Sequence, residues 1–160
     1  MLSQLEKIRE RWGGRHALID RWLEERHQLI VLYCHVSGVQ PSEKLSSSPQ
    51  QVQQLCQLLL DYISAGHFEI YQQLLEEEQE FGGYALPVMR KIYPQLTGTT
   101  DKAITFNDKY DTPEHCEQLK ADLAKDLSQL GEALALRFEL EDCLIETLHT
   151  AHQAQMQAAS

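Results

Sequence analysis

The chain has 160 residues, of which 42% are hydrophobic, with 14 basic and 24 acidic side chains and a formal net charge of −10. This length is typical of one domain that needs no disulfide or metal to fold, and the apolar content excludes a disordered chain. No apolar run approaches the ~18 residues of a membrane span, and the start MLSQLEKIRERW is too charged for a secretory signal. We therefore expect a cytoplasmic protein.

The charge is unevenly distributed. Residues 1–35 hold six basic and five acidic side chains, whereas residues 36–160 hold eight and nineteen. Direct nucleic-acid binding is disfavoured, because phosphate contacts need a basic surface. An acidic body suits a basic partner, although the same acidity could serve solubility alone.

Apolar residues at helical spacing predict a short helix over residues 2–12, ended by Gly13-Gly14. A second stripe predicts a longer helix over about 16–36, which Gly38 ends. At 1.5 Å per residue this second helix is about 32 Å long, a length suited to a helix bundle.

Residues 40–50 are a predicted polar loop. Ser48 and Pro49 have the residue types of a helix N-cap and first helical position. The helix that follows has its apolar stripe at 52–63, and Gly66 marks a position where it bends or ends.

A fourth helix, or a continuation of the third, carries apolar residues at 70–75. Its acidic end at 76–80 opposes the helix dipole, so we expect fraying there. A turn at Gly82-Gly83 precedes a short helix over 86–96, in which Pro94 lies near the C-terminal end.

Another short element is expected near 100–110, and Pro113 opens the last long helix, in which Gly131 marks a possible bend. No segment has the period of a strand. The sequence predicts an all-α protein, an antiparallel helix bundle with short additional connecting helices. Residues 1–150 form the single bundle domain, and 151–160 form a frayed C-terminal tail.

Several charged residues interrupt the apolar stripes. Arg26 and Glu141 fall on the stripes, Arg137 can pair with Glu141 four residues on, Asp61 adjoins Tyr62, and His67 follows a glycine. Burying an unpaired charge is costly. Either these are paired charges at the rim of the bundle or at helix ends, or they line a groove for a partner helix. In the second case the aromatic anchors are Trp22, Phe68 and Tyr71.

Metal and enzyme chemistry find little support. Glu24-x-x-His27 and Glu146-x-x-His149 have the spacing of a di-metal bundle, but both lie on helix flanks that face water. No phosphate-binding, dinucleotide or hydrolase motif occurs. We expect no cofactor, no metal and no catalysis. The cysteines have no C-x-x-C spacing and are expected to be small core residues: Cys34, Cys56, Cys116 and Cys143.

Two unusual runs carry a family resemblance. They are RWGGRHALIDRWLEERHQL at 11–29 and DYISAGHFEIY at 61–71, supported by 131–142 and by Tyr93-Pro94-Gln95-Leu96. Together they resemble the regulator of sigma D (Rsd/AlgQ) family of bacterial anti-sigma proteins. The likeness spans nearly the whole chain and is weakest at 38–50 and 97–113.

The resemblance implies a non-enzymatic anti-sigma factor. Its expected partner is region 4 of the primary sigma factor of RNA polymerase, a helix-turn-helix module that reads the −35 promoter element and docks on core polymerase. A one-to-one complex would block both contacts and favour alternative sigma factors when cells leave rapid growth. Expected partner-binding residues are Asp61 first, then Asp20, Arg21, Trp22, Arg26, His67, Phe68 and Tyr71, with Arg137 and Glu141 in support.

Two other classes stay open from the residues. One is a helical adaptor that regulates another enzyme or a phosphocarrier protein. The other is a di-metal helical bundle, which would contain iron or manganese.

Overall fold

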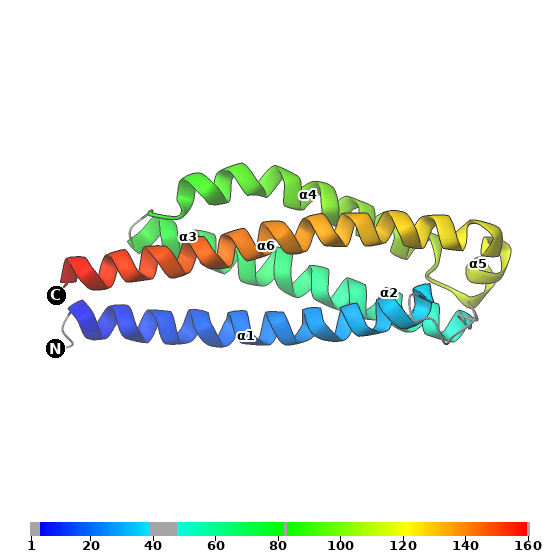
Figure 1. The fold of residues 1–160 in the computed structure, drawn as a ribbon, viewed down its shortest axis with the longest axis horizontal. Coiled ribbons are helices and arrows are strands. Elements are labelled where there is room, and N and C mark those ends of the chain that lie inside the picture. Colours follow the sequence, from blue (N-terminus) through cyan, green and yellow to red (C-terminus); the bar gives the residue numbers. More distant parts are fainter. Residues whose placement is uncertain (1–3, 39–47, 82, 160) are drawn as a thin grey trace.

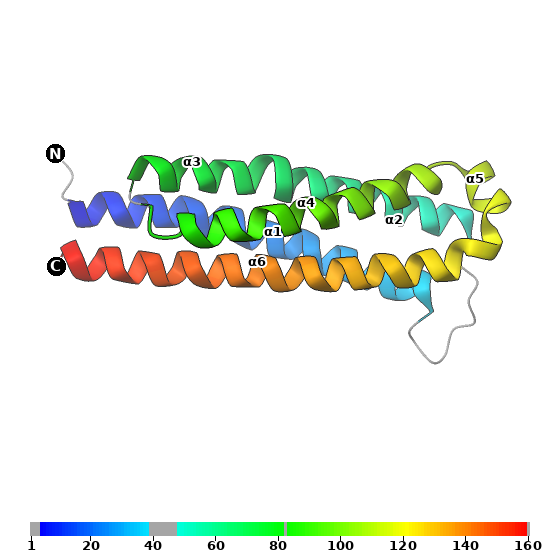
Figure 2. The same ribbon diagram turned by 90° about the horizontal axis from the view of Figure 1, so that it is seen from above.

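The computed structural model describes residues 4–38, 48–81 and 83–159. Across these ranges the chain is helical with no strand, so the predicted all-α bundle is confirmed. Helix α1 (Gln4–Ser37) and helix α6 (Leu123–Ala159) run side by side, and the start of α1 lies beside the end of α6 (Figures 1 and 2). None of the described helices is long and apolar enough to cross a membrane.

Helix α1 continues through Gly13-Gly14, so the predicted break there is wrong. A Cβ atom at either glycine would meet nothing within 4 Å, and neither glycine has a positive φ. The flanking side chains contact the rest of the bundle: Trp12 stacks on His152 of α6 with ring centroids 4.5 Å apart, and Arg15 forms ion pairs with Glu77 and Glu78. The helix ends where expected, at Gly38 with φ 69°.

Helix α2 (Pro49–Ile63) begins as predicted, with Ser48 and Gln51 forming a reciprocal capping box. The α-helical geometry ends at Ile63, three residues before Gly66, where the sequence predicted a bend or an end. The chain then passes through a seven-residue π-helix, η1 (Ser64–Ile70), into α3 (Tyr71–Phe81). A Cβ at Gly66 would lie 2.7 Å from Nε1 of Trp22, so glycine permits the close packing of η1 on α1.

Helix α4 (Leu86–Lys109) is one 24-residue helix, where two shorter elements were predicted. Pro94 lies inside it and removes one backbone donor. In the polar run after Pro94 two hydroxyls bond carbonyl oxygens of the preceding turn: Thr97 donates to Tyr93 O at 3.0 Å and Thr99 to Leu96 O at 2.8 Å.

The last long helix begins at Leu123, ten residues later than predicted. Pro113 instead opens a separate short helix, α5 (Pro113–Gln118), which Thr112 caps by accepting from the backbone of His115 at 3.1 Å. A 3-10 turn, η2 (Lys120–Asp122), leads into α6. The backbone of α6 is helical through Ala159, so fraying of 151–160 stays a prediction about behaviour in solution.

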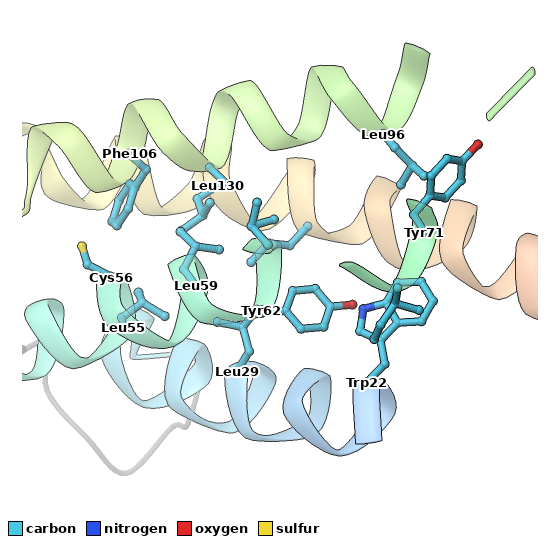
Figure 3. Packing of buried hydrophobic residues seen from close by; sticks show 14 of the residues in the cluster. Trp22, Leu29, Leu55, Cys56, Leu59, Tyr62, Tyr71, Leu96, Phe106 and Leu130 are labelled. Carbon is cyan, nitrogen blue, oxygen red and sulfur yellow. The ribbon is translucent and has the colours of Figure 1, made fainter. Parts of the chain in front are cut away.

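One hydrophobic core lies between α1, α2, α4 and α6 (Figure 3). Cross-helix contacts show that α1 and α6 are antiparallel: Trp12 meets His152, Arg26 meets Asp142, and Tyr33 donates to Leu127 O at 2.7 Å. The predicted antiparallel packing is therefore confirmed for this pair, and it brings the middle of α1 against the charged residues of α6.

Candidate functional site

A buried polar cluster occupies the middle of the bundle. We call it the central cluster: Arg26, Tyr62, Arg137 and Glu141. The carboxylate of Glu141 is 0% exposed and accepts from the Tyr62 hydroxyl, with 2.6 Å to Oε2. Nε of Arg137 lies 3.5 Å from Oε2, and Nη1 of Arg26 lies 3.8 Å from Oε1. One carboxylate thus faces two guanidinium groups and a phenol.

The central cluster joins four helices. Nη1 of Arg137 donates to the hydroxyls of Thr99 and Thr100 on α4, at 3.1 and 2.9 Å. Arg26 reaches from α1 to α6, where its Nη2 bonds Oδ1 of Asp142 at 2.7 Å. The predicted pairing of Arg137 with Glu141 is confirmed, and it occurs in the interior, where Arg137 is 1% exposed.

Burial sets the protonation of this cluster. Loss of water raises the pKa of Glu141 to about 7, against the opposing effects of Arg137, of the Tyr62 hydrogen bond and of Arg26. Burial also raises the pKa of Tyr62, and the adjacent carboxylate raises it further. Tyr62 is therefore a fixed hydrogen-bond donor, and Glu141 is the titratable member.

Aromatic rings cover the cluster. Trp22 and Tyr62 point toward each other with ring centroids 6.5 Å apart (Figure 3), and the Arg26 guanidinium lies 5.1 Å above the ring centre of Phe138. Trp22 and Tyr71 are each 2% exposed. These two of the three predicted aromatic anchors therefore lie in the core, and in this structure neither offers its ring to a partner.

Three predicted site residues are exposed on the outer surface. They are Asp20 and Arg21 on α1, and Asp61 on α2. His16 lies 3.5 Å from Asp20, and Nε2 of Gln57 donates to Asp61 at 3.0 Å. These contacts lie within a single helix in each case, so the carboxylates of Asp20 and Asp61 remain open to water.

An acidic surface lies where α1 meets α2 and η1. Burial raises the pKa of Glu25, Arg21 lowers it, and the charges of Asp61 and Glu69 raise it further. We call Glu25, Asp61 and Glu69 the acidic rim. Oε2 of Glu25 is buried without a hydrogen-bond partner among the described residues. Sequence reasoning found Asp61 but missed Glu25 and Glu69, which lie on different elements and converge only in the fold.

The remaining two predicted residues are His67 and Phe68. Their backbone belongs to η1, but their side chains lie outside the described part of the structure. Their place in the site stays a prediction.

A second missed feature joins α1 to α3. Nε of Arg15 lies 2.7 Å from Oε2 of Glu77, and its Nη2 lies 2.8 Å from Oε1 of Glu78. Glu78 is 1% exposed and also accepts from the backbone of Ala85 at 3.1 Å. Two residues of the acidic run at 76–80 thus pair with Arg15, and Glu78 does so in the interior, a role that the charge pattern alone did not reveal.

The metal motifs of the sequence do not converge. Glu24, His27, Glu146 and His149 are all exposed, as expected for helix flanks. Within residues 4–38, 48–81 and 83–159 no group of three or more potential ligands could hold a metal ion. Two cysteines are core residues as predicted, Cys56 and Cys116, whereas Cys34 is half-buried and Cys143 is exposed, contrary to expectation.

Comparison with known proteins places the chain in a family. Residues 1–149 match the family model described as regulator of RNA polymerase sigma(70) subunit, Rsd/AlgQ. A Regulator of sigma D of Yersinia pseudotuberculosis is 35% identical over 96% of this chain and 92% of its own length. One from Yersinia enterocolitica is 36% identical over 96% of this chain and 93% of its own length. One from an Enterobacter species is 37% identical over 91% of this chain and 88% of its own length.

No solved structure gives a significant match. The family match covers the three elements that carry the acidic rim, α1, α2 and η1, and all four residues of the central cluster. The chain therefore belongs to the Rsd/AlgQ family, the regulators of the sigma(70) subunit of RNA polymerase.

Proposed function

We propose that this protein is a cytoplasmic anti-sigma factor that acts by binding and not by catalysis. Its partner is region 4 of the primary sigma factor, held in a one-to-one complex. Occupation of region 4 blocks its contacts with core polymerase and with the −35 promoter element. The family match over residues 1–149 carries this proposal.

The charge of the protein supports a basic partner. The formal net charge is −10, and the acidic rim adds three carboxylates to one surface. A module that reads DNA has a basic surface, which an acidic surface attracts. This protein would therefore compete with DNA for the same basic residues of the module.

We assign the direct contacts to exposed residues. Asp61 is the leading candidate to meet an Arg or Lys of sigma, and the exposed Asp20 and Arg21 are further candidates. His67 and Phe68 belong to this proposed set through the sequence resemblance alone.

The buried residues of the predicted set act indirectly. Trp22 and Tyr71 fill the core beneath the surface. Arg26, Arg137 and Glu141 fix the positions of the helices that present it. We therefore propose positioning roles for these five residues.

A competition experiment tests the blocking mechanism. Reconstituted holoenzyme is bound to a labelled −35-dependent promoter fragment, and the protein is added in steps. We expect the promoter complex to be lost as one equivalent of protein per sigma is reached, with native mass spectrometry giving a one-to-one complex with sigma. A promoter complex that persists at excess protein would contradict the proposal.

A further inference from the structure

The outer surface where α1 packs on α2 contains a hollow of about 620 Å³. Val31, Leu32 and Leu58 give it an apolar lining, and Gln54 and Gln57 line its α2 side. The side chain of Val31 is 44% exposed. An open apolar surface of this kind is typical of a contact site for another molecule. We call it the α1–α2 hollow.

The α1–α2 hollow is continuous with the acidic rim. Gln57 lines the hollow and also donates to Asp61 at 3.0 Å, so the two features share a residue. Glu25 lies one helical turn before Gln28, an α1 residue that lines the hollow, so these two side chains share a face of the helix. An apolar seat and a group of carboxylates therefore lie next to each other on one surface.

We propose that the α1–α2 hollow and the acidic rim form one docking surface for a short amphipathic helix, in which a large apolar side chain is flanked by Lys or Arg. The lining of α1 extends from His27 to His35, about 12 Å at 1.5 Å per residue, or about two turns of a docked helix. The apolar side chain fills the hollow and the basic side chains meet the rim.

This inference rests on the proposed function, because the docked helix is assigned to region 4 of sigma. The α1–α2 hollow adds an apolar contact made by residues that were not predicted from the sequence, Val31, Leu32 and Leu58. Charge disfavours a second copy of the chain as occupant, since two bodies that each carry −10 repel each other.

The variant Val31→Asp tests the apolar seat. Val31 is 44% exposed, so an aspartate there leaves the core intact. The matched control is Leu136→Asp on α6, which is 40% exposed and does not line the hollow. Titration calorimetry with isolated region 4 should give a dissociation constant at least about tenfold weaker for Val31→Asp, and one within about twofold of wild type for Leu136→Asp.

The sign of the effect separates this inference from simple charge attraction. Val31→Asp adds a negative charge beside the acidic rim, so attraction by charge alone would leave the binding of a basic partner unchanged or make it tighter. Binding of region 4 to Val31→Asp at wild-type affinity, together with weakened binding to Asp61→Ala, would overturn the apolar seat and leave the proposed function standing.

A second probe covers the case in which region 4 does not bind the wild-type protein, which would overturn the proposed function. A labelled helical peptide of leucine and lysine is titrated by fluorescence anisotropy. Weaker binding to Val31→Asp than to Leu136→Asp supports the docking surface, whereas equal or tighter binding overturns it. A wild-type dimer in sedimentation that Val31→Asp converts to a monomer would also overturn it, since the occupant would be a second copy.

Discussion

The hydroxyl of Tyr62 donates to the buried carboxylate of Glu141, joining α2 to α6 across 79 positions of the chain. Asp61, the neighbour of Tyr62, is exposed. The interior contact and the proposed partner contact are therefore made by consecutive residues of one helix. The position of Asp61 on the surface therefore depends on the hydrogen bond between Tyr62 and Glu141 in the interior.

The first prediction concerns pH. Glu141 has a pKa of about 7 in the folded protein, raised above its ordinary value of 4.5. As pH rises from about 4.5 to about 7, the unfolded chain loses this proton first, so the free energy of unfolding falls by up to about 3 kcal/mol. Glu141→Gln removes this contribution. Urea unfolding at pH 5 and pH 7.5 should show a larger loss for wild type than for the variant, and equal losses would refute the assignment.

The second prediction concerns Arg137, which is 1% exposed and bonds Thr99 and Thr100. Arg137→Lys loses the planar fork that reaches α4 and α6 together, and it should lower the free energy of unfolding by roughly 2–4 kcal/mol. The exposed Arg21→Lys is the control and should stay within about 0.5 kcal/mol of wild type. Similar midpoints for both variants in thermal unfolding would count against the cluster as a structural link.

The third prediction separates two kinds of glycine. A Cβ at Gly66 would clash with Trp22, whereas one at Gly13 would meet nothing within 4 Å. Gly66→Ala should destabilise the protein, because either η1 or Trp22 must move. Gly13→Ala should stabilise it by about 0.5–1 kcal/mol, since alanine restricts the unfolded chain. Calorimetric melting of the two variants should give shifts of opposite sign.

The fourth prediction concerns the thiols. Cys143 is exposed, whereas burial raises the pKa of Cys56 to about 12 and raises the pKa of Cys116. The thiolate is the reactive form. A thiol reagent should modify Cys143 first in the folded protein, and Cys56 and Cys116 only after unfolding. Mass spectrometry of partially labelled protein identifies the order, which rapid modification of Cys56 would contradict.

Periodicity predicted the helices but misplaced several of their ends. Gly13-Gly14 was expected to end a helix, Gly66 to bend or end one, and Pro94 to lie near the end of one, yet the chain stays helical through each, with a π-helix around Gly66. Local propensity was overridden there by contacts distant in sequence, such as Trp12 on His152 and Gly66 against Trp22.

The candidate site was predicted in part for a similar reason. Arg137 and Glu141 are four residues apart on one helix, so their pairing could be read from spacing. The link from Glu141 to Tyr62 joins separate helices, and so does the acidic rim. Nor could the sequence say that Trp22 and Tyr71 face the core, because aromatic anchors and core aromatics have the same spacing.

Titration calorimetry of the protein with isolated region 4 of the primary sigma factor, at low and raised salt, tests the proposed role of Asp61, with Asp61→Ala beside wild type. We expect a one-to-one complex that weakens as salt rises, and at least about tenfold weaker binding for Asp61→Ala, whose exposed position leaves the fold intact. Equal affinity of the two proteins would contradict the role of Asp61, and no binding of wild type at either salt concentration would contradict the proposed function itself.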